Sequence, residues 1–246
     1  MNKYYKSKFL SNIIIFCSAS IATFSIPPFS FFFLIFVLGF GIYLITLRSS
    51  LKQTFIAGWF LGFGWFAFGL YWIGSAFMVA DTYHKVLMPL AIVILPSVLA
   101  IFWGLACVFA KLLTRKNQSS LFLIIVFLTL FEYLRAKLFT GFPWLMPSII
   151  LSSNEYLIQI FAFVGSFTAN LFVFSFSILP FVLISNFKSK YIIFGLLSVP
   201  ITILLFSSFF RFYNKDIEKT DNNLITLVQP NIEQKDKWKL EKRNTN

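Results

Sequence analysis

The side chains that could do chemistry in this sequence stand at the ends of long apolar runs. They are Asp81, His84 and Lys85 in one connection, Glu132 and Arg135 near the end of an apolar run, and Glu155 before the next run. Ion-coupled carriers usually place charged groups in mid-span, because charge has to be handled there. No internal repeat of hydropathy is visible either. Both observations disfavour a transporter.

Glu132 and Arg135 are three residues apart, so on a helix they share one face and can pair. The pair either anchors the membrane interface as a structural element or orients a headgroup or an adjoining domain. His84 is the only histidine, and a lone loop histidine is typically solvated, although it could meet a lipid headgroup. Cys17 and Cys107 lie in apolar stretches and are interpreted as small core residues. No metal site and no cofactor are predicted.

These side chains must be positioned by membrane helices. Apolar residues make up 58% of the 246 residues and charged residues 12%, which does not suit a soluble domain. The net charge of +12 does not indicate nucleic-acid binding, because the basic residues form short clusters between apolar runs.

Crossing the hydrocarbon core of a membrane takes about 20 mostly apolar residues. Seven such runs are present, at 9–26, 29–47, 55–79, 88–110, 120–138, 156–185 and 190–210. Pro27-Pro28 predicts a tight turn between the first two.

The distribution of Lys and Arg predicts the orientation of these spans. With seven spans, ten basic residues fall on one side: Lys3, Lys6, Lys8, Arg48, Lys52, Lys111, Arg115, Lys116, Lys188 and Lys190. The other side has Lys85, Arg135, Lys137 and Arg211 before the tail. The N-terminus is therefore predicted to be cytoplasmic and the tail from Phe212 to be periplasmic. Cleavage of the first span as a signal peptide is disfavoured, because it runs directly into a second apolar segment.

The tail differs in character from the spans. Residues 211–223 are polar, and Leu224-Ile225-Thr226-Leu227-Val228 reads as a short buried strand bounded by Pro230. One strand cannot fold alone. The sequence therefore predicts that a second domain begins here.

Two segments rich in glycine and aromatic residues stand out. The first runs from Gly58 to Trp72, where Gly58 and Gly62 predict close helix packing, and Tyr71 and Trp72 approach the outer interface. Its simplest interpretation is a packing helix with an aromatic belt.

The second segment is Phe139-Thr140-Gly141-Phe142-Pro143-Trp144, which is a turn followed by an apolar connection to the next span. We expect this connection to lie in the interface, where acyl chains or a partner domain could enter.

Three segments resemble the apolipoprotein N-acyltransferases. They are Gly58 to Trp72; Phe131-Glu132-Tyr133-Leu134-Arg135 with Phe139 to Trp144; and Leu227-Val228-Gln229-Pro230-Asn231-Ile232-Glu233-Gln234 with Lys237-Trp238. They occur in family order, and the seven-span outline fits between them. The third resembles the first strand of the family's nitrilase-like domain.

The resemblance implies a periplasm-facing enzyme of the bacterial inner membrane. Such an enzyme moves an acyl chain from a phospholipid to the N-terminal diacylglyceryl-cysteine amine of a lipoprotein. In the family, the nitrilase-like domain supplies a Cys nucleophile, a Glu base and a Lys that stabilises the oxyanion. The residues carried over as a lipid-access or domain-docking interface are Tyr71, Trp72, Glu132, Arg135, Phe142, Pro143 and Trp144.

The chain departs from the family pattern at two places. It stops about eight residues after Lys237-Trp238, before a segment that could hold the catalytic residues, and Asp81-Thr82-Tyr83-His84 lacks a glycine-rich loop. No catalytic residue is assigned, and the chain alone is expected to be inactive.

The expected architecture is an all-α polytopic membrane domain of seven transmembrane helices at 1–211. It is followed at 212–246 by a short periplasmic stub of a truncated α/β nitrilase-like domain. Two alternatives remain: a non-enzymatic membrane platform that docks a separately encoded nitrilase-like chain, and a gene relic without function.

Overall fold

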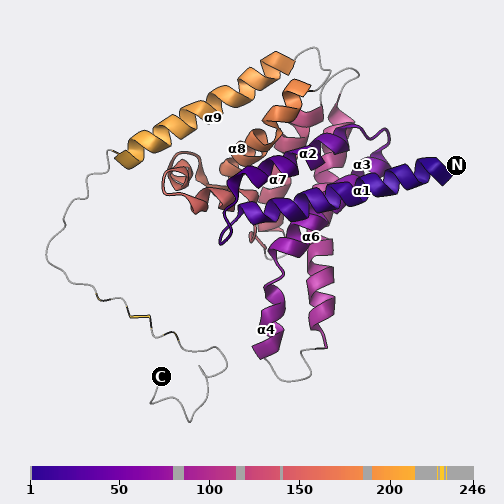
Figure 1. The fold of residues 1–246 in the computed structure, drawn as a ribbon, viewed down its shortest axis with the longest axis horizontal. Coiled ribbons are helices and arrows are strands. Elements are labelled where there is room, and N and C mark those ends of the chain that lie inside the picture. The colour runs from indigo at the N-terminus through magenta and orange to yellow at the C-terminus, as the bar shows by residue number, and fades with distance from the viewer. Residues whose placement is uncertain are drawn as a thin grey trace, which may run out of the picture.

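The computed structural model describes residues 2–79, 86–114, 120–138, 141–184 and 190–213, with four single positions in the tail. Within these ranges every regular element is a helix, which agrees with the all-α prediction (Figure 1). The α-helices are α1 (Asn2–Ala22), α2 (Ile35–Thr46), α3 (Leu51–Gly69), α4 (Ile73–Val79), α6 (Met88–Leu113), α7 (Ser120–Lys137), α8 (Ile160–Ile184) and α9 (Lys190–Tyr213). Short 3₁₀ helices cover Thr23–Ser25, Phe32–Leu34, Pro147–Ser153 and Leu157–Gln159.

Four helical segments are long and apolar enough to cross a membrane: Lys8–Ser25, Met88–Leu113, Leu157–Ile184 and Ile193–Tyr213. Each of the seven apolar runs contains a helix, but the second, third and fifth runs supply none of these four segments. The fifth run forms α7, an 18-residue helix that carries Glu132, Arg135 and Lys137. The second holds a shorter helical segment, Phe32–Thr46, because the chain turns through Pro27-Pro28 before it. The third is divided between α3 and α4.

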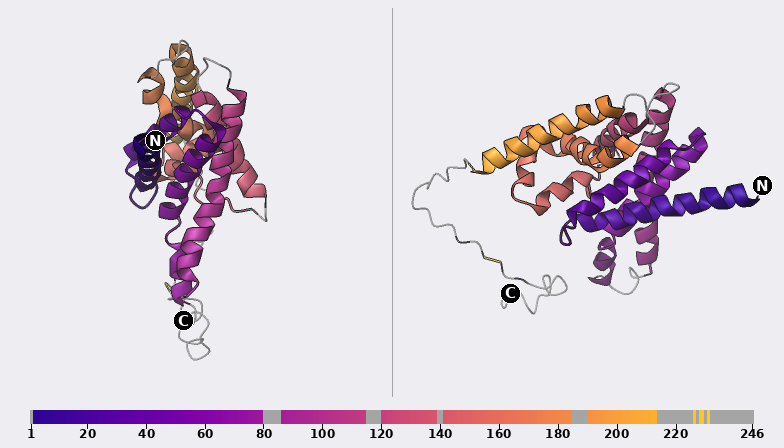
Figure 2. Two further views of the ribbon diagram at one scale, coloured as in Figure 1. Left: turned by 90° about the vertical axis from the view of Figure 1, so that its right-hand side faces the viewer. Right: turned by 45° about the horizontal axis from the view of Figure 1, so that its top comes forward.

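The division of the third run falls at Leu70-Tyr71-Trp72. The Leu70 amide still bonds to the Phe66 carbonyl at 2.9 Å, and the Ile73 amide bonds to the Leu70 carbonyl at 3.0 Å. This turn ends α3 and starts α4, which packs against the first part of α6 and extends with it from the body of the protein (Figures 1 and 2).

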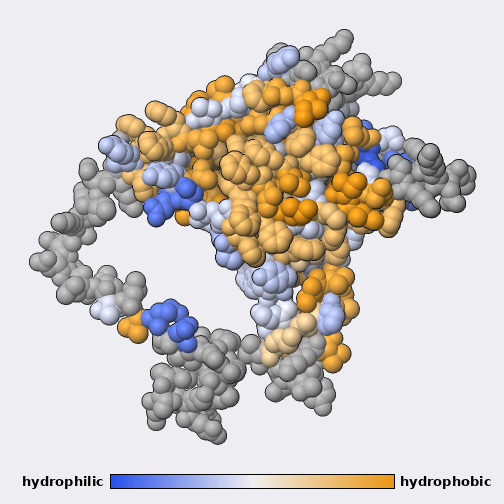
Figure 3. All heavy atoms as spheres, viewed as in Figure 1, coloured by the Kyte–Doolittle hydropathy of each residue, from blue (hydrophilic) through white to orange (hydrophobic). Residues whose placement is uncertain are grey.

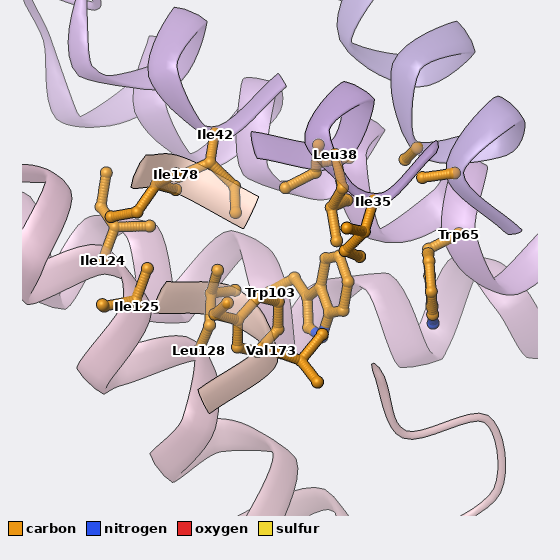
Figure 4. Close-up of a cluster of buried hydrophobic side chains, with 14 of the residues drawn as sticks. Ile35, Leu38, Ile42, Trp65, Trp103, Ile124, Ile125, Leu128, Val173 and Ile178 are labelled. Atoms are coloured by element: carbon orange, nitrogen blue, oxygen red, sulfur yellow. The ribbon is translucent and has the colours of Figure 1, made fainter. Parts of the chain in front are cut away.

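The interior is formed mainly by α2, α3, α6, α7 and α8. Figure 4 shows Trp103 of α6 at its centre, between Leu38 of α2, Leu128 of α7 and Val173 of α8. Trp103 is fully buried and its ring lies 6.1 Å from that of Trp65 on α3.

Glycines allow the closest helix approaches. A Cβ atom added at Gly58 would lie 2.9 Å from the carbonyl oxygen of Trp103, and one at Gly62 would lie 3.0 Å from the Cα of Ala100. Both contacts are between α3 and α6, so the close packing predicted from the Gly58 and Gly62 pattern is confirmed. Gly39 of α2 packs directly on the backbone of Ser177 in α8.

The outer surface of the bundle is apolar over a large area (Figure 3). Phe33, Phe206 and Leu196 are among many large apolar side chains that are mostly exposed. The core interpretation holds for Cys107, which is buried, but it is wrong for Cys17, which is exposed on α1. In hydrocarbon the outward face of a helix is as apolar as its packed face, so apolar neighbours do not imply burial.

Several predictions concern residues outside the described ranges. They are the connection from Asp81 to Lys85, which contains His84; the residues Phe139 and Thr140; and most of the tail, where a second domain is expected to start. Of the buried strand expected at 224–228, the structure describes Thr226 and Val228. Neither residue is in a strand, and Val228 is 77% exposed.

Candidate functional site: a buried ion pair beneath an aromatic loop

The centre of the candidate site is the ion pair between Glu132 and Arg135 in the last turns of α7. The predicted pairing is confirmed: Arg135 Nη2 donates to Glu132 Oε2 at 2.6 Å and Nε donates to Oε1 at 3.2 Å. The side chains are 0% and 1% exposed. It is the one ion pair within the described part of the chain. Removing two charges from water is costly unless each also has further hydrogen-bonding partners.

Those further partners come from distant parts of the sequence. Trp103 Nε1 on α6 donates to Glu132 Oε1 at 2.7 Å. Arg135 Nη1 donates to the carbonyl oxygen of Phe142, and the guanidinium carbon lies 4.9 Å from the centre of the Phe66 ring. The pair therefore connects α6 and α3 to the chain that follows α7.

That chain, residues 141–153, is called the aromatic loop below. It begins at Gly141, where φ is +79° and an added Cβ would overlap the carbonyl of Ala136. Only glycine adopts such a conformation without cost. The loop then turns at Leu145, which also has a positive φ of 58°.

Two more hydrogen bonds hold the aromatic loop on the bundle. Trp65 Nε1 of α3 donates to the Leu145 carbonyl at 3.0 Å. The Ser148 amide donates to Asn170 Oδ1 of α8 at 2.8 Å. Trp65, Ser148 and Asn170 are all buried, so both bonds are shielded from water.

The aromatic loop forms one wall of a 460 Å³ pocket, called the loop pocket below. Its lining is mainly apolar, with three serine side chains; it comprises Leu70, Trp72, Pro143, Trp144, Leu145, Met146, Ser148, Ile149, Ser152, Phe161 and Ser166. Trp72 and Trp144 stack at 5.1 Å between ring centres, and both remain about half exposed. An apolar pocket with an exposed aromatic rim suits a ligand with an apolar chain.

Another part of the pocket lining comes from α8, which is broken at Gly165. Gly165 has φ 70° and ψ 172°, a region that is essentially restricted to glycine. The break separates Phe161 from Ser166, and both line the loop pocket.

The predicted site residues thus fall into two groups. Trp72, Pro143 and Trp144 line the loop pocket, and Phe142 packs on Trp144 at 5.3 Å. Tyr71 lies on the other side of Trp72, where both line a second pocket of 270 Å³. Glu132 and Arg135 lie beneath the loop, with no exposed surface to meet a headgroup directly.

Sequence reasoning missed Trp65, Trp103 and Asn170, the bundle residues that position the loop and its ion pair. A buried tryptophan or asparagine needs a hydrogen-bond partner, but the partner's position in the sequence is set by packing. In the described part of the chain no cluster of His, Cys, Asp and Glu could hold a metal ion.

Trp65→Phe is expected to loosen the aromatic loop without unfolding the bundle. The substitution removes the donor to the Leu145 carbonyl, and a buried carbonyl without a donor costs about 1–3 kcal/mol. Hydrogen exchange at the amides of Phe142 and Ser148 should accelerate. Trp59→Phe is the matched control, because Trp59 Nε1 donates at 3.0 Å to the Ser97 carbonyl, away from the loop. Equal exchange in the two variants would contradict the role of Trp65.

Comparison with known proteins gives the family. Residues 18–179 match the family described as Apolipoprotein N-acyltransferase N-terminal domain. The chain belongs to this family. The matched part of the N-acyltransferase domain begins inside α1, ends inside α8 and includes every residue of the loop pocket.

Several apolipoprotein N-acyltransferases are similar over most of this chain. The protein of Allorhizobium ampelinum is 30% identical over 88% of the chain and 43% of its own length. The protein of Rickettsia bellii is 31% identical over 80% of the chain and 40% of its own length. The protein of Rhodopseudomonas palustris is 34% identical over 76% of the chain and 35% of its own length. The chain therefore spans less than half the length of these relatives. With its long apolar helices, this N-acyltransferase family member is a helical membrane protein.

Proposed function

We propose that this chain is the membrane half of an apolipoprotein N-acyltransferase and that its loop pocket admits an acyl chain of the donor phospholipid. The observation that carries the proposal is the loop pocket: an apolar hollow with a rim of stacked tryptophans, within the part of the chain that matches the family.

The proposed topology has seven crossings of the bacterial inner membrane. They are formed by α1, α2, α3 with α4, α6, α7, α8 and α9, with the N-terminus cytoplasmic and the tail from 212 onward periplasmic. The excess of Lys and Arg on the N-terminal side supports this orientation. In this topology the aromatic loop and the turn at Tyr71 and Trp72 both face the periplasm, where aromatic rings favour the interface.

The pocket suits acyl-chain entry for electrostatic and steric reasons. The aromatic loop, which forms one wall of the pocket, is held on the bundle by hydrogen bonds. Arg135 donates to the Phe142 carbonyl, and Trp65 donates to the Leu145 carbonyl. The charges of Glu132 and Arg135 neutralise one another out of reach of the pocket, so its lining remains suited to a hydrocarbon chain.

The transfer chemistry is proposed to belong to a nitrilase-like domain that starts in the tail at 212–246. In the mechanism implied by the family, a Cys thiolate attacks the phospholipid ester, the acyl C–O bond breaks, a lysophospholipid leaves and a thioester remains. The amine of the lipoprotein's N-terminal cysteine then takes the acyl group. No residue of the 246 matches the family's catalytic Glu, Lys or Cys, so we expect the purified 246-residue chain to transfer no acyl groups by itself.

Trp144→Ala tests the role of the loop pocket. In an enzyme reconstituted from this chain and a nitrilase-like half, the variant is expected to lower acyl transfer at least about tenfold, because the rim loses a large stacked ring. Transfer is measured as formation of triacylated lipoprotein with phospholipid vesicles as donor. Phe206→Ala is the control, since Phe206 is 70% exposed on α9, away from the loop pocket.

Unchanged transfer by the Trp144→Ala enzyme would remove the loop pocket from the proposal. The half-exposed Tyr71, Trp72 and Trp144 also offer an apolar surface on which a separately encoded nitrilase-like chain could dock. Loss of co-purification of the two halves in Trp144→Ala would favour that docking role over lipid access.

A further inference from the structure

Arg48 is a buried cation with no acidic partner in the part of the chain that the structure describes. It lies between the end of α2 and the start of α3, and its residue is only 9% exposed. The sequence contains no Asp or Glu before Asp81. Among the described residues, no carboxylate lies within ion-pair distance of Arg48. Burial lowers the pKa of its guanidinium, because the charged form loses hydration.

The hydrogen bonds of Arg48 leave most of its donors free. Nη2 donates to Ser11 Oγ at 2.9 Å and to Asn12 Oδ1 at 2.7 Å, both on α1. Both acceptors are neutral. A guanidinium has five N–H donors, so the three on Nε and Nη1 find no acceptor within the described part of the chain. Nε is also buried, where an unsatisfied charged donor is costly.

The neighbouring helix ends do not neutralise the charge. The negative end of the α2 dipole precedes Arg48, and the positive end of the α3 dipole follows it three residues later. Each end carries about half a charge and the two have opposite sign, so their effects on Arg48 largely offset one another.

We propose that Arg48, positioned by Ser11 and Asn12, binds the phosphate of an anionic phospholipid headgroup at this face of the membrane. A phosphate supplies the missing charge and several strong acceptors at once, and the two N–H groups of Nη1, which make no hydrogen bond to the described part of the chain, can donate to it. The exposed Lys52, four residues after Arg48, adds positive charge that favours an anion near the site. The site is distinct from the loop pocket, which none of these residues lines.

The chemistry selects the lipid class. A zwitterionic headgroup brings its own cation to the phosphate, whereas a phosphatidylglycerol headgroup has a net negative charge. The membrane surface provides such headgroups at high local concentration, so we assign the occupant to the lipid and not to free phosphate.

Native mass spectrometry of the detergent-purified 246-residue chain tests the site. The probes are short-chain phosphatidylglycerol, short-chain phosphatidylcholine and inorganic phosphate. We expect one phosphatidylglycerol to bind tightly, and Arg48→Gln to weaken that binding about tenfold or more, since charge-assisted bonds are lost. Lys52→Gln, which removes an exposed charge, should weaken it about twofold or less.

Arg48→Lys covers the case in which Arg48→Gln does not fold. It keeps the charge but loses the planar guanidinium that Ser11 and Asn12 hold in place, and should still weaken phosphatidylglycerol binding several-fold. Unchanged binding in Arg48→Lys or Arg48→Gln would overturn the proposal. Equal binding of phosphatidylcholine, or displacement of phosphatidylglycerol by inorganic phosphate at similar concentration, would overturn the assignment to an anionic lipid.

Discussion

Glu132→Ala is expected to lower the free energy of unfolding by about 3–5 kcal/mol, which is the usual cost of leaving one member of a buried ion pair without its partner. Arg135 would be left at 1% exposure without its carboxylate partner, and Trp103 Nε1 would lose its acceptor. Denaturant or SDS unfolding of the purified chain in detergent, followed by circular dichroism, measures the change.

The double variant Glu132→Leu with Arg135→Met separates charge from packing. It removes both charges and keeps apolar volume, so it should recover a large part of the stability lost in Glu132→Ala. The aromatic loop should still loosen in this variant, because the donor from Arg135 to the Phe142 carbonyl is gone. A double variant as unstable as Glu132→Ala would contradict the electrostatic explanation.

Gly39→Ala is expected to cost about 3 kcal/mol or more, at the upper end of what overpacking costs. A methyl group at Gly39 on α2 would overlap the backbone carbonyl of Ser177 on α8. A side chain could rotate away, but a helix backbone must move as a whole. The α2 and α8 contact, which forms one side of the core, would have to separate. The same unfolding measurement applies.

Gly195→Ala is the matched control for Gly39→Ala. Gly195 lies in α9, and an added Cβ there has no neighbour within 4 Å. Alanine restricts the unfolded chain more than glycine does, so this variant should be more stable by about 0.5–1 kcal/mol. Loss of stability in both variants to the same extent would show that helix glycines matter for a reason other than the α2 and α8 contact.

The buried ion pair shows how far sequence reasoning reaches in the candidate site. The spacing of Glu132 and Arg135 was sufficient to predict their pairing, because residues three apart share a helix face. Their contacts with Trp103 and Phe142 could not be predicted in the same way. Trp103 is 29 residues from Glu132 in the chain, and only the packing of α6 against α7 brings the two together.

The helix breaks at Trp72 and Gly165 show a second limit of what can be predicted from the sequence. Both runs stay apolar through the break, so hydropathy is continuous where the backbone is not. Gly165 is one of 11 glycines, and most of those in the helices serve close packing or cause no distortion. Only the observed φ of 70° marks it as the point at which α8 is interrupted to form a wall of the loop pocket.

By itself, the sequence determined that this is a helical membrane protein with helices in the observed order, because the transfer of apolar side chains from water to hydrocarbon depends on local composition. Three segments taken together, the two rich in glycine and aromatic residues and the one in the tail, also predicted its family. The tertiary structure alone decided which face of each helix is packed, as the contrast between exposed Cys17 and buried Cys107 shows. It also brought Trp72 and Trp144 together over a pocket and left Nε of Arg48 buried without an acceptor among the described residues. The physical reason is that helices in lipid associate through close packing and hydrogen bonds. The faces of such a helix are all apolar, so hydrophobicity does not indicate which face packs against another helix and which faces lipid.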